Sequence, residues 1–146
     1  MLRLLFFALL LFGTAATAQK RVIESDLAPA PIGPYSQAID VNGTVYVSGQ
    51  IGLIPGAGKL VAGGIDTEVP RIMENIQAIL KAANLTLREI VSTTIYVKNM
   101  ADFPRINKLY ESYFTGEYPA RSTVGVADLP AGANVEIAVI AVRRKY

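Results

Sequence analysis

Two residues of opposite charge stand within otherwise apolar stretches near the C-terminal end of the chain. Arg121 follows Pro119 in the stretch YPARSTVGV, and Glu136 stands inside VEIAVIAV, in phase with Ala138 and Ile140. A carboxylate on such a strand surface needs a cationic partner or acquires a raised pKa. A guanidinium on a neighbouring strand makes either a structural salt bridge with it or an anion clamp beside an acid–base group. The distinction is whether a void for a small anionic ligand lies between them.

Each of these polar residues also has a purely structural interpretation. Arg121 is then an edge-strand charge, and Glu136 is a solvated charge near the start of its strand. Asn107 lies four residues after Phe103 and three before Tyr110, on or beside an apolar helical stripe. An amide there either lines a site or bonds to nearby backbone. The residues alone leave these alternatives open.

The chain contains no cysteine and no histidine. It therefore folds without disulfides and lacks thiol nucleophiles, imidazole bases and the usual zinc or iron ligands. Any chemistry must use carboxylates, hydroxyls, Arg, Lys, Asn and backbone groups. Tyr35, just before the first strand of a predicted hairpin, and Ser48, within its second strand, form a further polar cluster of this kind.

The first 18 residues have the pattern of a signal peptide. Arg3 precedes an unbroken apolar run from Leu4 to Phe12, and Ala16-Thr17-Ala18 precedes Gln19. The run is too short to span a bilayer, and Ala-x-Ala is what signal peptidase reads. We expect cleavage near Ala18–Gln19 and export to a periplasm or out of the cell, in preference to a retained anchor helix. Residues 19–146 then form a single domain.

The mature chain is nearly neutral. Cleavage removes Arg3 and leaves 13 basic against 12 acidic residues, a net charge of about +1. With no basic stripe, this balance argues against a nucleic-acid partner. No stable membrane association is expected either, because no apolar run reaches spanning length.

Residue patterns predict five strands and two helices after an extended, proline-stiffened lead. Asn42-Gly43 is a two-residue turn that joins the first two strands as a hairpin. A glycine-rich loop, Pro55–Gly64, precedes the first helix. The expected strands are Ser36–Val41, Thr44–Gln50, Ile90–Val97, Ala120–Val126 and Asn134–Val142.

The first helix is expected to begin at Asp66 or Thr67, where either side chain can cap it. Pro70 is then tolerated because it lies in the first turn or just at its end. Asn84 is expected to end the helix in a left-handed conformation.

The second helix is expected to begin with Asp102 as its cap and to end at Gly116. The order β-β-α-β-α-β-β then gives an α+β fold with two helices packed on one face of a mixed sheet. In the last strand, Val135–Val142, apolar residues occupy both alternating sets of positions, so both faces of the strand are apolar. Something must therefore cover the second face of the sheet, and another copy of the chain is the expected cover.

Several stretches resemble the RidA/YjgF family of reactive enamine and imine deaminases. They are IGPYSQA (32–38), VSGQIG (47–52), INKLYESYF (106–114), YPARSTVGV (118–126) and VEIAVIAVRR (135–144). The resemblance covers essentially the whole mature chain in order. It implies a chorismate-mutase-like fold and a homotrimer, in which the sheets pack into a central barrel and the pockets lie between neighbouring subunits.

The resemblance also implies a reaction, the hydrolysis of a 2-imino acid to a 2-keto acid and ammonia. The imino acid forms from an enamine such as 2-aminoacrylate, and no metal or organic cofactor is needed. Arg121 resembles the arginine that pairs with the substrate carboxylate, and Glu136 the acidic residue that holds or activates the attacking water. An exported member would serve an exported amino-acid oxidase or dehydrogenase.

Further site residues follow from the same resemblance. Tyr35, Ser48 and Asn107 resemble the tyrosine, serine and asparagine that line the pocket, and Gly49 beside Ser48 allows close approach. Thr123 departs from the family pattern, since many active members carry cysteine there. This departure bears on rate and substrate range more than on the chemistry.

Other functions remain to be weighed against the deaminase. The main alternative is a non-catalytic binding protein or sensor for small carboxylates such as 2-keto acids. Ribonuclease activity has been associated with some relatives, but the near-neutral charge gives RNA little to bind. A holdase role for unfolded proteins leaves no signature in the sequence.

Overall fold

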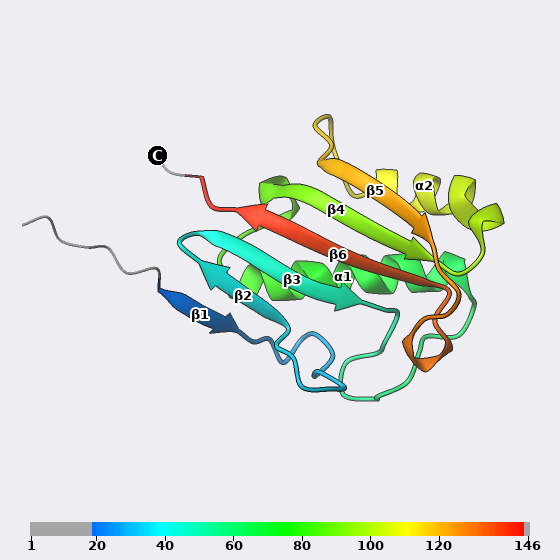
Figure 1. Ribbon diagram of the computed structural model, residues 1–146, viewed down its shortest axis with the longest axis horizontal. Helices are drawn as coiled ribbons and strands as arrows, with labels where there is room; N and C mark the ends of the chain where they lie inside the picture. Colours follow the sequence, from blue (N-terminus) through cyan, green and yellow to red (C-terminus); the bar gives the residue numbers. More distant parts are fainter. Residues whose placement is uncertain (1–18, 145–146) are drawn as a thin grey trace, which may run out of the picture.

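The strands form one mixed sheet with both α-helices on the same face, as predicted (Figure 1). The computed structural model describes residues 19–144. The strand order is β1-β2-β3-β6-β4-β5, and every neighbouring pair is antiparallel except β4–β5. The strands are β1 (Lys20–Ile23), β2 (Ala38–Val41), β3 (Thr44–Gln50), β4 (Ile90–Val97), β5 (Ala120–Gly125) and β6 (Val135–Val142). The helices are α1 (Ile65–Ala82) and α2 (Phe103–Glu111), and short 3₁₀ turns are η1 (Leu87–Glu89), η2 (Met100–Asp102) and η3 (Pro130–Gly132).

The predicted hairpin is confirmed, and one strand was not predicted. Asn42 (φ 53°) and Gly43 (φ 87°) both adopt the left-handed conformation that a tight hairpin turn requires, and they connect β2 to β3. Strand β1 adds a sixth strand antiparallel to β2. Its sequence, KRVI, buries only Ile23, so it lacks the alternation that marks a longer half-buried strand.

Helix α1 begins earlier than predicted and without a side-chain cap. Its first residue is Ile65, and the residue before it is Gly64 with φ 66°. Thr67 does not cap the helix but donates its hydroxyl to the carbonyl of Gly64 at 3.0 Å. Pro70 consequently lies inside the helix and not at its first turn, where its missing N–H removes one intrahelical bond. Asn84 has φ 57°, which confirms the predicted left-handed stop.

Helix α2 begins where predicted, with Asp102 as its N-cap residue, but the predicted capping bond and the predicted end at Gly116 were wrong. Asp102 makes no side-chain capping bond, and the side chain of Asn99 instead caps the 3₁₀ turn η2 that leads into the helix. The helix ends at Glu111. Gly116 has φ 99° and lies in the connection to β5, so its left-handed backbone serves that turn and not the helix end.

The main core lies between the two helices and the sheet. Burial of each large apolar side chain contributes about 1.5–3 kcal/mol to folding. A second, smaller cluster of Ile51, Leu53 and Ala133 lies under the loops and is packed by Leu60 and Leu129. The largest fully buried side chains of the main core are Ile72, Met73, Ile76, Ile79, Leu80, Ile95, Ile106 and Ile137.

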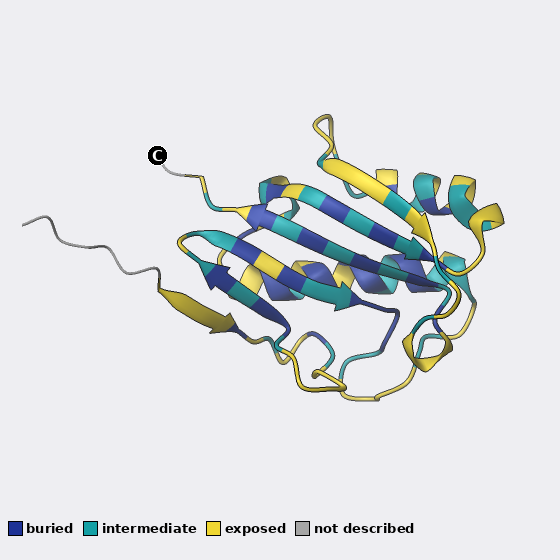
Figure 2. Cartoon of the chain, in the orientation of Figure 1, coloured by how far each residue is buried: buried dark blue, intermediate teal, exposed yellow. Residues whose placement is uncertain are grey.

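No element of the described chain covers the other face of the sheet, which is turned toward the viewer in Figure 1. Buried and partly exposed residues alternate along β4 and β6, whereas β5 is exposed along most of its length (Figure 2). Tyr46, Val124 and Val142 are 49%, 46% and 39% exposed. The apolar face that the sequence predicts is therefore open in the single chain.

The predicted signal peptide, residues 1–18, lies outside the described residues, as do residues 145 and 146. Within residues 19–144, no helix is both long enough and apolar enough to cross a bilayer. In the same range, no group of three or more acidic, histidine or cysteine side chains is placed to hold a metal ion.

Candidate functional site

Arg121 lies on β5 and is positioned by side chains of α2. Its Nη2 donates a hydrogen bond to Oδ1 of Asn107 at 2.7 Å. Its guanidinium carbon lies 5.2 Å from the ring centroid of Tyr110 and 5.9 Å from that of Phe103. Cation–π attraction holds the planar group over the rings, and its remaining N–H donors can still bind an anion.

Tyr110 supports Arg121 from within the core. Its hydroxyl and that of Thr93 on β4 are hydrogen-bonded at 3.0 Å, and both side chains are buried. Burial raises the pKa of Tyr110, although the bond to Thr93 and the charge of Arg121 oppose the change, so the phenol stays protonated at neutral pH. A cavity of about 420 Å³ opens beside this group and is lined by Asn107, Tyr110, Glu111, Tyr118, Pro119 and Arg121.

Glu136 lies on β6, on the open face of the sheet, and is half-buried. Burial raises the pKa of its carboxyl group. None of the salt bridges within residues 19–144 includes Glu136. Of the two possibilities drawn from the sequence, a cationic partner or a raised pKa, the single chain therefore has the raised pKa.

Gly49 gives the carboxylate its space. A Cβ atom added at Gly49 would overlap the carboxylate of Glu136, lying only 2.6 Å from its Cδ. Real Cβ contacts of that length do not occur, so any side chain at position 49 would displace Glu136. The predicted close approach at this glycine is thus an approach between two parts of the same chain.

A β-bulge brings Gly49 to this position. Val47 pairs with Val139 and Gln50 pairs with Ile137, so β3 takes three residue steps where β6 takes two. A bulge of this kind re-aims side chains and is frequent next to active sites. It buries Gln50 on the helix side of the sheet and leaves the glycine facing the carboxylate.

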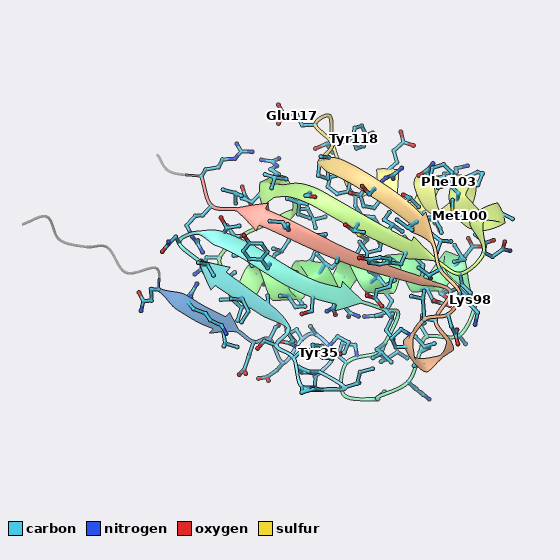
Figure 3. All side chains as sticks on the ribbon, in the orientation of Figure 1. Tyr35, Lys98, Met100, Phe103, Glu117 and Tyr118 are labelled. Atoms are coloured by element: carbon cyan, nitrogen blue, oxygen red, sulfur yellow. The ribbon has the colours of Figure 1, made fainter. Side chains whose placement is uncertain are left out.

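Tyr35 and Ser48 lie beside the same carboxylate. The hydroxyl of Ser48 donates to the carbonyl of Ser36 at 2.7 Å. The hydroxyl oxygen of Tyr35 accepts from the backbone N–H of Ile32 at 3.1 Å, which leaves its own hydrogen available to donate. Figure 3 shows Tyr35 in the segment between β1 and β2, across the sheet from Phe103 at the start of α2.

A second cavity, of about 320 Å³, contains the Glu136 group. It is formed by the proline-rich segment before β2 (residues 29–35, the proline-rich lead), by the end of β3 with the loop that follows it, and by the loop before β6. Its lining residues are Pro29, Ala30, Pro31, Ile32, Tyr35, Gln37, Ser48, Gly49, Gln50, Ile51, Leu53, Pro130 and Glu136.

Within one chain, Arg121 and Glu136 cannot share a ligand. Arg121 pairs in register with Thr93 of β4, whose side chain is buried under the helices, and Glu136 pairs with Tyr96 of the same strand. Side chains alternate between the two faces along a strand, and Thr93 and Tyr96 are three residues apart, so they point to opposite faces. Arg121 shares the face of Thr93, and Glu136 shares the face of Tyr96. The two charges are also separated by β4, which corrects the expectation of a carboxylate on the neighbouring strand.

The predicted site residues therefore fall into two groups. Tyr35, Ser48 and Gly49 join Glu136, and Asn107 joins Arg121. Thr123 lies two residues after Arg121 on the same strand and is half-buried, but it does not line either cavity.

Sequence reasoning missed the aromatic support of the arginine. The sequence pattern places Phe103 and Tyr110 in an apolar helical stripe, but it does not indicate that their rings contact the guanidinium of Arg121. Their spacing around Asn107 is the signal, because residues at i, i+4 and i+7 share one helix face. A polar residue within such a stripe marks where a charged partner can dock.

The two groups supply complementary chemistry. Arg121 offers an anion-binding fork on an aromatic support, and Glu136 offers a carboxylate with a raised pKa, which can take up and return a proton closer to neutral pH than an exposed one. Together they suit a small anionic substrate that undergoes proton transfer.

The Endoribonuclease L-PSP family model matches residues 25–143. The chain belongs to this family, the RidA/YjgF family. The RidA/YjgF relatives include a mouse protein named 2-iminobutanoate/2-iminopropanoate deaminase, which is 47% identical over 127 residues, covering 87% of this chain and 94% of the relative.

Solved structures of other RidA/YjgF proteins have the same fold. YyfA from Yersinia pestis, of the conserved Rid protein family, is 48% identical with a TM-score of 0.83, covering 86% of this chain and 100% of that one. TdcF from E. coli, solved with bound serine, is 38% identical with a TM-score of 0.81, covering 85% and 99%. These likenesses support the predicted α+β fold over nearly the whole described chain.

Proposed function

We propose that this RidA/YjgF protein is an imine deaminase that hydrolyses 2-imino acids to 2-keto acids and ammonia. The observation that carries the proposal is the half-buried carboxylate of Glu136, whose pKa is raised by burial and whose space is made by Gly49. The name of the mouse relative supports the same reaction.

Arg121 binds the carboxylate of the imino acid. Its guanidinium is held by Asn107 and by the rings of Tyr110 and Phe103, so little side-chain freedom is lost when the substrate docks. A planar fork can pair with both carboxylate oxygens at once. The substrate is thereby oriented, and the contribution of Arg121 to rate is mainly one of proximity.

Glu136 transfers the proton. It accepts a proton from water as the water oxygen forms a bond to the C=N carbon, and it passes that proton to the imine nitrogen to give the tetrahedral adduct. The same carboxylate then takes the hydroxyl proton of the adduct and delivers it to the amine nitrogen. The C–N bond breaks, ammonia leaves and the 2-keto acid remains. Acid–base assistance of this kind contributes about 10²- to 10⁴-fold.

The protein acts as a homotrimer with its sites between subunits. This proposal is supported by the opposite orientations of Arg121 and Glu136, which require two chains to meet on one substrate. It is also supported by the open sheet face, where Tyr46, Val124 and Val142 remain exposed in the single chain. The same face of neighbouring copies would cover these side chains around a central barrel.

The protein is exported, to a periplasm or out of the cell, after cleavage near Ala18–Gln19. The support is the sequence pattern of residues 1–18. Intact-mass measurement of protein from the exported fraction tests it. A mass beginning at Gln19 is expected, and retention of residues 1–18 would contradict it.

The enzymatic proposal is tested with purified residues 19–146. An amino-acid oxidase generates the imine, and semicarbazide traps whatever has not been hydrolysed. The protein is expected to lower the yield of trapped product, and Arg121→Ala is expected to lose most of that effect. Arg105→Ala is the matched control, because Arg105 is an exposed arginine of α2 that pairs with Asp66 and not with the site.

Failure of this assay has a defined meaning. If wild-type protein leaves trapping unchanged across several amino acids, it is not a deaminase of 2-imino acids. Tight calorimetric binding of a 2-keto acid in the same preparation would then identify a binding protein or sensor for small carboxylates.

A further inference from the structure

The cavity beside Glu136 is lined by somewhat more apolar than polar surface. At about 320 Å³ it falls at the lower end of the range of about 300–1,000 Å³ that is usual for small-molecule sites. Glu136 is the one charged residue that lines it. The apolar part of the wall comes mainly from Pro29, Pro31, Ile32, Ile51, Leu53 and Pro130.

Two buried amides fix the walls in place. The side chain of Gln37 donates to the carbonyls of Pro29 at 2.8 Å and Ser25 at 3.0 Å, and accepts from the N–H of Ser25 at 2.6 Å. These bonds hold the proline-rich lead against the sheet. On the other side of the cavity, Asn75 of α1 donates to the carbonyl of Leu53 at 3.0 Å. These hydrogen bonds tie both walls of the cavity to the rest of the chain.

The back of the cavity rests on a small core of its own. Ile51 and Leu53 are each 6% exposed, and they pack with the fully buried Ala133. The loop that carries Ala133 is tied to α1, since the buried carboxylate of Glu68 accepts the N–H of Asn134 at 2.9 Å. This backing prevents the wall from collapsing when the cavity is only partly filled.

We infer that this cavity binds the side chain of the imino acid, and that the enzyme prefers 2-imino acids with bulky apolar side chains, branched aliphatic or aromatic. The inference rests on the proposed function. With the substrate carboxylate at Arg121 and the reacting carbon at Glu136, the side chain is the one remaining part of the substrate. A methyl group leaves most of the apolar wall uncovered, whereas an isobutyl or benzyl group covers it. Each methylene buried is worth about fourfold in affinity.

The same cavity discriminates against acidic side chains. A second carboxylate would lie beside the half-buried carboxylate of Glu136 in a cavity without a cation among its described lining residues, and the like charges would repel. The imine of glutamate is therefore the poorest substrate of comparable size.

The first test measures kcat/KM for imines generated from alanine, leucine, phenylalanine and glutamate. The leucine and phenylalanine imines are expected to exceed the alanine imine by at least about tenfold, with the glutamate imine lowest. Highest activity on the alanine or glutamate imine overturns the inference and leaves the deaminase function standing. No acceleration of any of the four overturns the deaminase function itself.

The second test narrows the cavity. Ala30 lines the cavity and is exposed, so Ala30→Leu can project into it without disturbing the core. The ratio of kcat/KM for the phenylalanine imine to that for the alanine imine is expected to fall at least about tenfold. Ala82→Leu, an exposed alanine at the end of α1, should keep the wild-type ratio. An unchanged ratio in Ala30→Leu overturns the inference.

Discussion

The side chains of Arg121 and Glu136 leave the same sheet on opposite faces, with β4 between their strands. No rotamer change brings them onto one small ligand, because the sheet itself separates them. The guanidinium of Arg121 is hydrogen-bonded to Asn107 of α2. The carboxylate of Glu136 lines the cavity next to the bulge of β3. A substrate that needs both groups must therefore lie between two chains.

Mixing two inactive variants should restore activity. Arg121→Ala chains keep the Glu136 half of the site, and Glu136→Gln chains keep the Arg121 half. In trimers reassembled from equal amounts of both, random pairing should give about one quarter of wild-type activity, since one in four interfaces joins two intact halves. The measurement is the imine-trapping assay after reversible dissociation.

The control for that experiment is a chain that carries both substitutions, mixed in the same way with Arg121→Ala chains. No chain in that mixture carries Arg121, so no site can contain both Arg121 and Glu136, and the mixture should stay inactive. Native mass spectrometry establishes that mixed trimers have formed. Mixed trimers without activity in the first experiment would mean that the site is not shared between chains.

The pH profile should report the titration of Glu136. Burial raises its pKa above the ordinary value of 4.5. Because the carboxylate form accepts the proton from water, kcat/KM should rise with pH and level off above the raised pKa. Glu136→Gln should lower kcat by about 10²- to 10⁴-fold and lose this acid limb.

Glu24→Gln provides the comparison, since Glu24 is exposed and lies outside the cavity. It should retain both the wild-type rate and the wild-type profile. An acid limb that persists unchanged in Glu136→Gln would assign the titration to another group.

Asn107→Ala should weaken substrate binding more than turnover. Loss of the acceptor for Nη2 leaves Arg121 free to swing, and a hydrogen bond to a charged group at this exposed site should be worth about tenfold in KM. Lys108→Ala, the exposed neighbour on the same helix, should change KM by less than about twofold. A fall in kcat at unchanged KM would place Asn107 in the chemical step instead.

Gly49→Ala should lower catalytic efficiency without unfolding the protein. Gly49 is not in a left-handed conformation, so alanine strains no backbone angle there, but its Cβ would overlap the carboxylate of Glu136. The carboxylate must turn away, and kcat/KM should fall at least about tenfold. Circular dichroism should show the native sheet. Full activity in Gly49→Ala would mean that the present position of Glu136 is not the active one.

Much of the fold could be read from local patterns. The alternation in β3, the continuous apolar run of β6, the Asn42-Gly43 turn and the helical stripe of α2 each depend on residues close in sequence, and each was predicted with the right type. Element ends were less well predicted. Gly64 begins α1 in place of a capping side chain, because a left-handed glycine redirects the chain there.

By itself, the sequence determined which residues carry chemistry and, through its family motifs, the reaction they imply. Only the tertiary structure decided how these residues are grouped. Three features depend on pairings between segments far apart in the chain: the strand order, the extra residue in β3, and the register that β4 makes with β5 and β6. No local pattern specifies such pairings. Those long-range pairings put Arg121 and Glu136 on opposite faces and built the apolar cavity from loops that are distant in sequence.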